Sequence, residues 1–190
     1  MPKQKITREM VIDAAFELAR TDGMEQVLVK NIAKKLGCSV QPIYSYCENM
    51  EELRTAVAER AQQFVKAYAA AHIDQNDLFR STGRAYIQIA KEEPHLHKIV
   101  TFKKRDGISS LEDLYQSEAN PQMAQAIAGS LDISMEKAKQ LHLNMLIYTL
   151  GISMVFSVAK PGIPAEEIFS QQESAYYAFL KYAMEEKEHE

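Results

Sequence analysis

Residues 29–47, VKNIAKKLGCSVQPIYSYC, decide how the front of this chain folds. The apolar residues of its first half share the i, i+3, i+4, i+7 spacing of one helix face: Val29, Ile32, Ala33 and Leu36. Gly37 ends that helix, and a short turn leads into a second helix expected over Gln41–Cys47, with Val40 and Ile43 as its apolar anchors. Two short helices joined through a glycine-led turn predict a helix-turn-helix, although any three-helix bundle can show the same pattern.

The rest of the chain also has the pattern of helices. Thr7 can cap a helix that runs to about Thr21, and Asn49 with Glu52 forms a capping box for a longer one. Five more helices are predicted, at about 77–92, 95–103, 121–131, 134–159 and 164–188, while 105–120 is expected to be a mobile connection. No run alternates with the period of a strand, so the predicted fold class is all-α.

The charge of the chain is distributed unevenly. Its 190 residues carry 22 Lys or Arg against 26 Asp or Glu, a net charge of −4. Residues 1–46 hold seven basic and five acidic groups, net +2, which leaves 15 against 21, net −6, for residues 47–190. The acidic excess argues against a protein that coats nucleic acid indiscriminately, but it allows a local basic surface. A difference this small also fits chance.

Several stretches match one known family in order and without a gap: VIDAAFEL (11–18), DG (22–23), NIAKKLGCS (31–39), IYSYC (43–47) and NMEEL (49–53). Residues 7–60 thereby resemble the DNA-binding domain of the tetracycline-repressor (TetR/AcrR-like) family of bacterial transcription regulators. The sequence departs from the family pattern in four places. Leu28 replaces the usual Ser or Thr cap, Cys47 an aromatic residue and Met50 a lysine, and Gln41-Pro42 stands where Gly followed by Ser or Thr is frequent.

The resemblance implies a two-domain organisation. An N-terminal three-helix helix-turn-helix domain would occupy residues 1–48, followed by a connecting helix over 49–71. A larger helical ligand-binding and dimerisation domain would span 49–190. The implied function is a homodimeric regulator, most simply a repressor that a small molecule releases from a near-palindromic operator. The two cysteines and the short polar start, without a signal-peptide pattern, indicate a cytoplasmic protein. The alternatives are activation or chromosome organisation by the same fold, or a helical ligand-binding or interaction protein that has lost DNA binding.

The resemblance also suggests which residues would contact DNA. Tyr44 would bind the phosphate backbone, with Lys30 and Ser39 beside it. The candidates for base contacts are Gln41 and Tyr46, and for a thymine methyl Pro42. The residue types alone leave other interpretations open, because Tyr44 could be a half-buried core residue, and Lys30 and Gln41 could be ordinary exposed side chains.

Residues 140–159 form a 20-residue stretch without Asp, Glu, Lys or Arg. Its length would suit a membrane span, but its histidine, asparagine, serine and threonine residues make a poor one. A helix that is apolar nearly all round is expected to be buried on all sides, here by a second copy of the chain. The expected dimer interface consists of Ile152, Val155, Ile168, Ala175, Phe179 and Tyr182. The alternative is that both final helices complete a monomeric core.

A small-molecule cavity in the C-terminal domain follows from the resemblance alone. Its candidate lining residues are Phe79, Tyr86, Ile89, Phe102, Tyr115, Met123, Met145 and Tyr148, each of which could also be plain core. His95 and His97 lack the spacing of a metal site, and Cys38 and Cys47 are expected to be free thiols. No motif of an enzyme is present, so we expect no catalysis, cofactor or metal.

Overall fold

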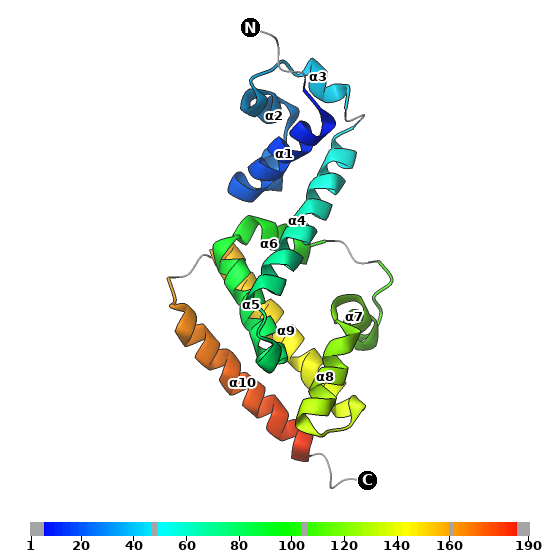
Figure 1. The fold of residues 1–190 in the computed structure, drawn as a ribbon, viewed down its shortest axis with the longest axis vertical. Coiled ribbons are helices and arrows are strands. Elements are labelled where there is room, and N and C mark those ends of the chain that lie inside the picture. The colour runs from blue at the N-terminus through cyan, green and yellow to red at the C-terminus, as the bar shows by residue number, and fades with distance from the viewer. Residues whose placement is uncertain (1–5, 47–48, 104–105, 160–161, 186–190) are drawn as a thin grey trace. The chain divides into compact units, whose positions relative to one another are not determined.

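The computed structural model describes residues 6–46, 49–103, 106–159 and 162–185, and its regular elements there are all helices (Figure 1). The predicted all-α fold class is therefore confirmed. The chain forms two compact units. The N-terminal unit contains residues 1–68 and 93–103, and the C-terminal unit contains residues 69–92 and 104–190.

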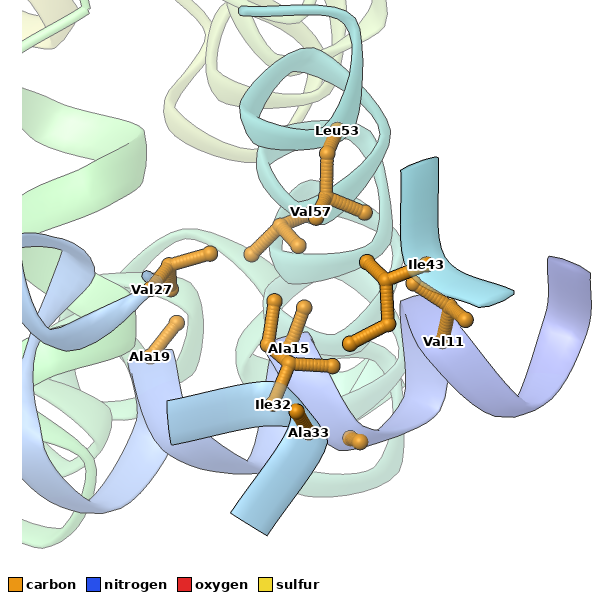
Figure 2. Packing of buried hydrophobic residues seen from close by; sticks show 10 residues of the cluster. Val11, Ala15, Ala19, Val27, Ile32, Ala33, Ile43, Leu53 and Val57 are labelled. Atoms are coloured by element: carbon orange, nitrogen blue, oxygen red, sulfur yellow. The ribbon is translucent and has the colours of Figure 1, made fainter. Parts of the chain in front are cut away.

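The N-terminal unit is built on α1 (Arg8–Asp22), α2 (Val29–Leu36), α3 (Gln41–Tyr44), the first part of α4 (Met50–His72) and α6 (Pro94–Thr101). A 3-10 turn, η1 (Met24–Gln26), follows α1. As expected, the Thr7 hydroxyl caps α1 by accepting a hydrogen bond from the Met10 amide at 3.2 Å. The core consists of small and branched side chains that interlock between four helices and the turn: Val11, Ala14, Ala15, Ala19, Val27, Ile32, Ala33, Ile43, Leu53 and Val57 (Figure 2).

Charged side chains reinforce this core from its edge. The guanidinium of Arg20 donates to both carboxylate oxygens of Glu93 through Nε at 3.0 Å and lies 4.9 Å from the ring centre of Phe64. Arg60 of α4 pairs with Asp13 of α1. The Arg60 guanidinium also lies over the ring of Phe16, 5.3 Å from its centre. Because each guanidinium thus covers an aromatic ring, packing and charge act together to fix α1 against its neighbours.

The C-terminal unit is organised around α9 (Met135–Ala159), which packs against α5 (Leu78–Glu92), α8 (Pro121–Leu131) and α10 (Ala165–Glu185). Two further short elements, η2 (Gln75–Asp77) and α7 (Leu111–Glu118), complete it. Its core falls into two clusters, one around Leu141 and Tyr176 and the other around Ile87 and Phe156. By length and composition alone, α9 could cross a membrane. Its packing on three helices instead makes it the central helix of a folded unit.

Two expectations for secondary structure were wrong. The region 105–120, expected to be a mobile connection, contains α7. Its start is capped, since the Ser110 hydroxyl accepts from the Asp113 amide at 3.1 Å, and the Asp113 carboxylate accepts from the Ser109 amide at 3.0 Å. The second helix of the helix-turn-helix ends at Tyr44, three residues before the expected end at Cys47, which lies outside the described residues.

Candidate nucleic-acid interface

The turn between α2 and α3 depends on one glycine. Gly37 has φ +64°, in the left-handed region where a side chain is strained. The amide of the next residue, Cys38, donates to the Ala33 carbonyl at 3.0 Å and so closes the end of α2. At the other end, Leu28 provides no side-chain cap for α2, as its residue type predicted.

A single buried side chain holds α3 in place. Ile43 is 1% exposed and lies beside Val11 in the core, as Figure 2 shows. Val40, expected to be a second anchor, is instead 43% exposed at the N-terminus of α3. That position puts an exposed apolar side chain next to Gln41. The sequence could not show which of Val40 and Ile43 is buried, because both residues are apolar.

The predicted DNA-contact residues all lie on α2, the turn, α3 or just after it. Four of them are exposed: Lys30, Ser39, Gln41 and Tyr44. We call these four residues the candidate DNA surface. Tyr44 is 56% exposed, so it is not the half-buried core tyrosine of the alternative interpretation. Pro42 is partly buried, and Tyr46 packs its ring partly against the core cluster, which limits how far it can reach outward.

The ion pairs of the N-terminal unit leave the lysines of α2 available. Within its described residues the pairs are formed by arginines: Arg8–Glu52, Arg20–Glu93, Arg20–Glu17, Arg54–Glu51 and Arg60–Asp13. Lys30, Lys34 and Lys35 of α2 are exposed and take part in none of these pairs. Since these ion pairs do not use the three lysines, their charges can bind an external anion such as a phosphate.

Met50 stands where the family pattern has a lysine at the start of α4. Its side chain is partly buried against the core cluster, so it contributes packing and no charge. Asn49 caps the start of α4, because its side-chain oxygen accepts a hydrogen bond from the Glu52 amide at 2.8 Å. The substitution therefore leaves the fold intact and removes one possible phosphate contact.

The expected cavity residues are not all brought together. Phe79, Met123 and Met145 belong to one cluster of the C-terminal unit, and Tyr115 adjoins that cluster through its hydrogen bond to His142. Ile89 is buried, Tyr148 is partly buried and Tyr86 is at the surface. Phe102 is exposed and belongs to the N-terminal unit, apart from the other seven.

The expected dimer residues also divide. Ile152 and Ile168 pack within the cluster around Phe156, Phe179 packs within the cluster around Leu141, and Ala175 is partly buried. Val155 and Tyr182 point to solvent. A row of exposed apolar side chains, which we call the α9 strip, lies along one face of α9: Ile147, Met154, Val155 and Val158.

Known proteins resemble the chain most clearly in its N-terminal unit. Residues 11–57 match the family model for bacterial regulatory proteins of the tetR family. YobS of Bacillus subtilis, named an uncharacterized HTH-type transcriptional regulator, is 23% identical over 108 residues, or 55% of this chain and 56% of that protein. Nucleoid occlusion factor SlmA of Actinobacillus pleuropneumoniae is 27% identical over 108 residues, or 53% of this chain and 54% of that protein. The chain thus matches these curated relatives over about half of their length.

Solved structures extend the likeness to the whole fold. A TetR-like transcriptional regulator from Rhodococcus sp. RHA1 aligns with a TM-score of 0.64 at 12% identity, over 95% of this chain and 99% of that chain. A TetR-family transcriptional regulator from Haemophilus influenzae aligns with a TM-score of 0.55 at 19% identity, over 90% of this chain and 94% of that chain. At such identities the agreement is one of architecture: a helix-turn-helix unit joined to a larger helical unit.

Proposed function

We propose that this TetR-like chain is a homodimeric, sequence-specific regulator of transcription that a small molecule releases from a near-palindromic operator. The observation that carries the proposal is the candidate DNA surface, which lies within residues that match the family model. It combines a basic residue, a hydroxyl group, an amide and an exposed tyrosine on one helix-turn-helix. We assign the chain to the cytoplasm and assign it no enzymatic activity.

In this proposal α3 enters the major groove. Gln41 lies at its first turn, where an amide can form two hydrogen bonds with adenine. Lys30 and Tyr44 contact phosphates and set the position of the helix, which adds affinity but no sequence preference. With Met50 in place of a lysine, each subunit has few phosphate contacts, so binding depends on both subunits of a dimer.

The α9 strip supports dimerisation. Exposed apolar side chains on one face of a central helix are stabilised when a second copy covers them, and a two-fold axis pairs the strip with itself. A two-fold dimer places its recognition helices about 34 Å apart, one turn of DNA, which predicts two half-sites with that spacing. A small molecule then acts only if it binds one spacing of these helices more tightly than another.

The contact residues can be tested by alanine substitution. Lys30→Ala and Tyr44→Ala should each weaken binding to all duplexes, by roughly tenfold, and Lys30→Ala should also reduce the salt dependence of binding. Gln41→Ala should change the preferred base at one position of each half-site and leave binding to non-specific DNA almost unchanged. Fluorescence anisotropy with operator and scrambled duplexes measures both effects.

The matched control is Lys91→Ala, since Lys91 is exposed on α5 of the C-terminal unit. It should bind both duplexes as the unaltered protein does. If Gln41→Ala leaves base preference unchanged, α3 does not read the bases through Gln41, and our assignment of the surface fails.

A second candidate function is a role on the chromosome other than transcription. One relative is named a nucleoid occlusion factor, and its 27% identity to this chain exceeds that of the relative named a transcriptional regulator. The two functions differ in where the sites lie. Genome-wide mapping of bound sites would place a transcription regulator at promoters, whereas a chromosome-organising protein would occupy many sites within genes.

A further inference from the structure

Helix α7 buries one side chain in the C-terminal unit. Tyr115 is its one buried residue and is only 4% exposed, while its neighbours on the helix are partly or fully exposed. At the surface, Glu112 lies 4.0 Å from Lys139 of α9, an exposed pair that contributes little. The tyrosine side chain is therefore the main anchor of α7.

That anchor ends on a buried histidine. The Tyr115 hydroxyl lies 2.9 Å from Nδ1 of His142 on α9. If the hydroxyl donates to Nδ1, both groups are paired; the reverse arrangement would leave the tyrosine proton without an acceptor. Burial lowers the pKa of His142 to about 4, so the ring is neutral at neutral pH and Nδ1 can accept.

Aromatic rings surround this hydrogen bond. The His142 ring lies edge-on to Tyr115, with centroids 5.3 Å apart at 88°, and edge-on to Phe79, with centroids 5.6 Å apart at 88°. The ring centroids of Phe79 and Tyr176 are in turn 5.8 Å apart. The apolar residues of the cluster around Leu141 continue beyond them and include Met123 and Met145, whose flexible side chains adapt to different shapes.

We propose that His142 and Phe79 form a binding site for small phenols, and that Tyr115 fills this site as an internal phenol when no ligand is bound. This inference rests on the proposed function in one respect: the phenol would be the small molecule that releases the regulator from its operator. The tyrosine side chain is itself a phenol with an alkyl group opposite its hydroxyl. A free phenol of this shape can make the same hydrogen bond and the same edge-on contacts once α7 moves away.

The exchange requires α7 to give up its one buried side chain. Once α7 has moved away, a ligand in the place of Tyr115 makes the contacts with His142 and Phe79 that the tyrosine made. The remaining side chains of the helix are partly or fully exposed. The site would thus be a minor conformation of the free protein that a ligand makes dominant. The chemical class follows from the occupant: a flat ring, apolar on both faces, with one hydroxyl that donates.

The probes are 4-methylphenol and toluene, which have nearly the same shape and differ in the hydroxyl. Titration calorimetry on the full chain should detect 4-methylphenol binding below about 5 mM, with toluene at least about tenfold weaker. Tyr115→Phe should tighten 4-methylphenol binding by about two- to tenfold, because the internal ring remains but can no longer donate to His142. A purely structural role of Tyr115 predicts no such gain.

The matched control is Tyr177→Phe, which removes the hydroxyl of an exposed tyrosine on α10 and should leave binding unchanged. His142→Phe keeps a ring and should abolish the preference for 4-methylphenol over toluene. The proposal is overturned if 4-methylphenol does not bind in this range, or if Tyr115→Phe binds it no more tightly. The calorimetry contains no DNA, so it measures phenol binding independently of operator binding. Phenol binding without operator binding would refute the proposed function alone. Operator binding without phenol binding would refute this site alone.

Discussion

Val155→Asp should convert the protein from a dimer to a monomer and lower its operator affinity by at least about 100-fold. Val155 is 52% exposed in the middle of the α9 strip, and Val158, one helical turn away, is 61% exposed. In a two-fold dimer a carboxylate at this position would be buried close to its own symmetry mate, and unpaired buried charges cost several kcal/mol. Sedimentation velocity measures the mass, and fluorescence anisotropy measures the affinity.

Position 155 is a sharper test than Phe179, which we expected from the sequence to lie in the interface. Phe179 packs within the cluster around Leu141, so an aspartate there would damage the core of a single subunit as well. The matched control is Gln125→Asp on α8, which adds the same charge at an exposed position of the same unit. A dimer that survives Val155→Asp would refute an interface built on the α9 strip.

Ile43→Ala should lower the free energy of unfolding of the N-terminal unit by about 2–5 kcal/mol. Ile43 is the one buried side chain of α3, and its removal leaves a cavity against the core of α1, α2 and α4. Without its anchor α3 is no longer held against α1, so operator binding should fall together with stability. Urea denaturation followed by circular dichroism measures the loss of stability.

Val40→Ala provides the comparison for this prediction, because Val40 is exposed at the N-terminus of the same helix. It should change stability by less than about 0.5 kcal/mol. Equal losses for the two substitutions would mean that α3 is not held in the core by Ile43.

The sequence allowed the N-terminal unit to be predicted closely because several independent signals agree there. Apolar spacing placed Ile32 and Ala33 in the core, Gly37 ended α2, and Thr7 capped α1. The exposure of Lys30 and Gln41 follows from the same helical spacing. Each of these signals is local, so a single sequence contains all the information that they require.

The sequence signals were weaker where structure depends on distant contacts. Nothing local to Val40 shows that α3 turns it outward, and nothing local to Tyr115 reveals that it shares a hydrogen bond with a histidine 27 residues later. Phe102 was grouped with residues of the C-terminal unit, although the segment that contains it packs with the N-terminal unit. Helix α7 is different, because its N-cap at Ser110 is local and could have been recognised.

The interface residues show a further limit. Both faces of α9 are apolar, so spacing alone could not separate Ile152, which packs inside its own unit, from Val155, which faces solvent. Only the positions of α5, α8 and α10 decide which face of α9 remains uncovered. The face that remains uncovered carries the α9 strip. Of the residues expected in the interface, only those that are exposed can contact a partner.

The most direct test of the central claim is selection of binding sites from random duplexes by the purified full chain at about 150 mM salt. We predict enrichment of a near-palindromic consensus, with half-sites one helical turn apart and a position that changes in Gln41→Ala. Recovery of duplexes without any enriched sequence would contradict sequence-specific recognition, and with it the proposal that this protein regulates transcription at an operator.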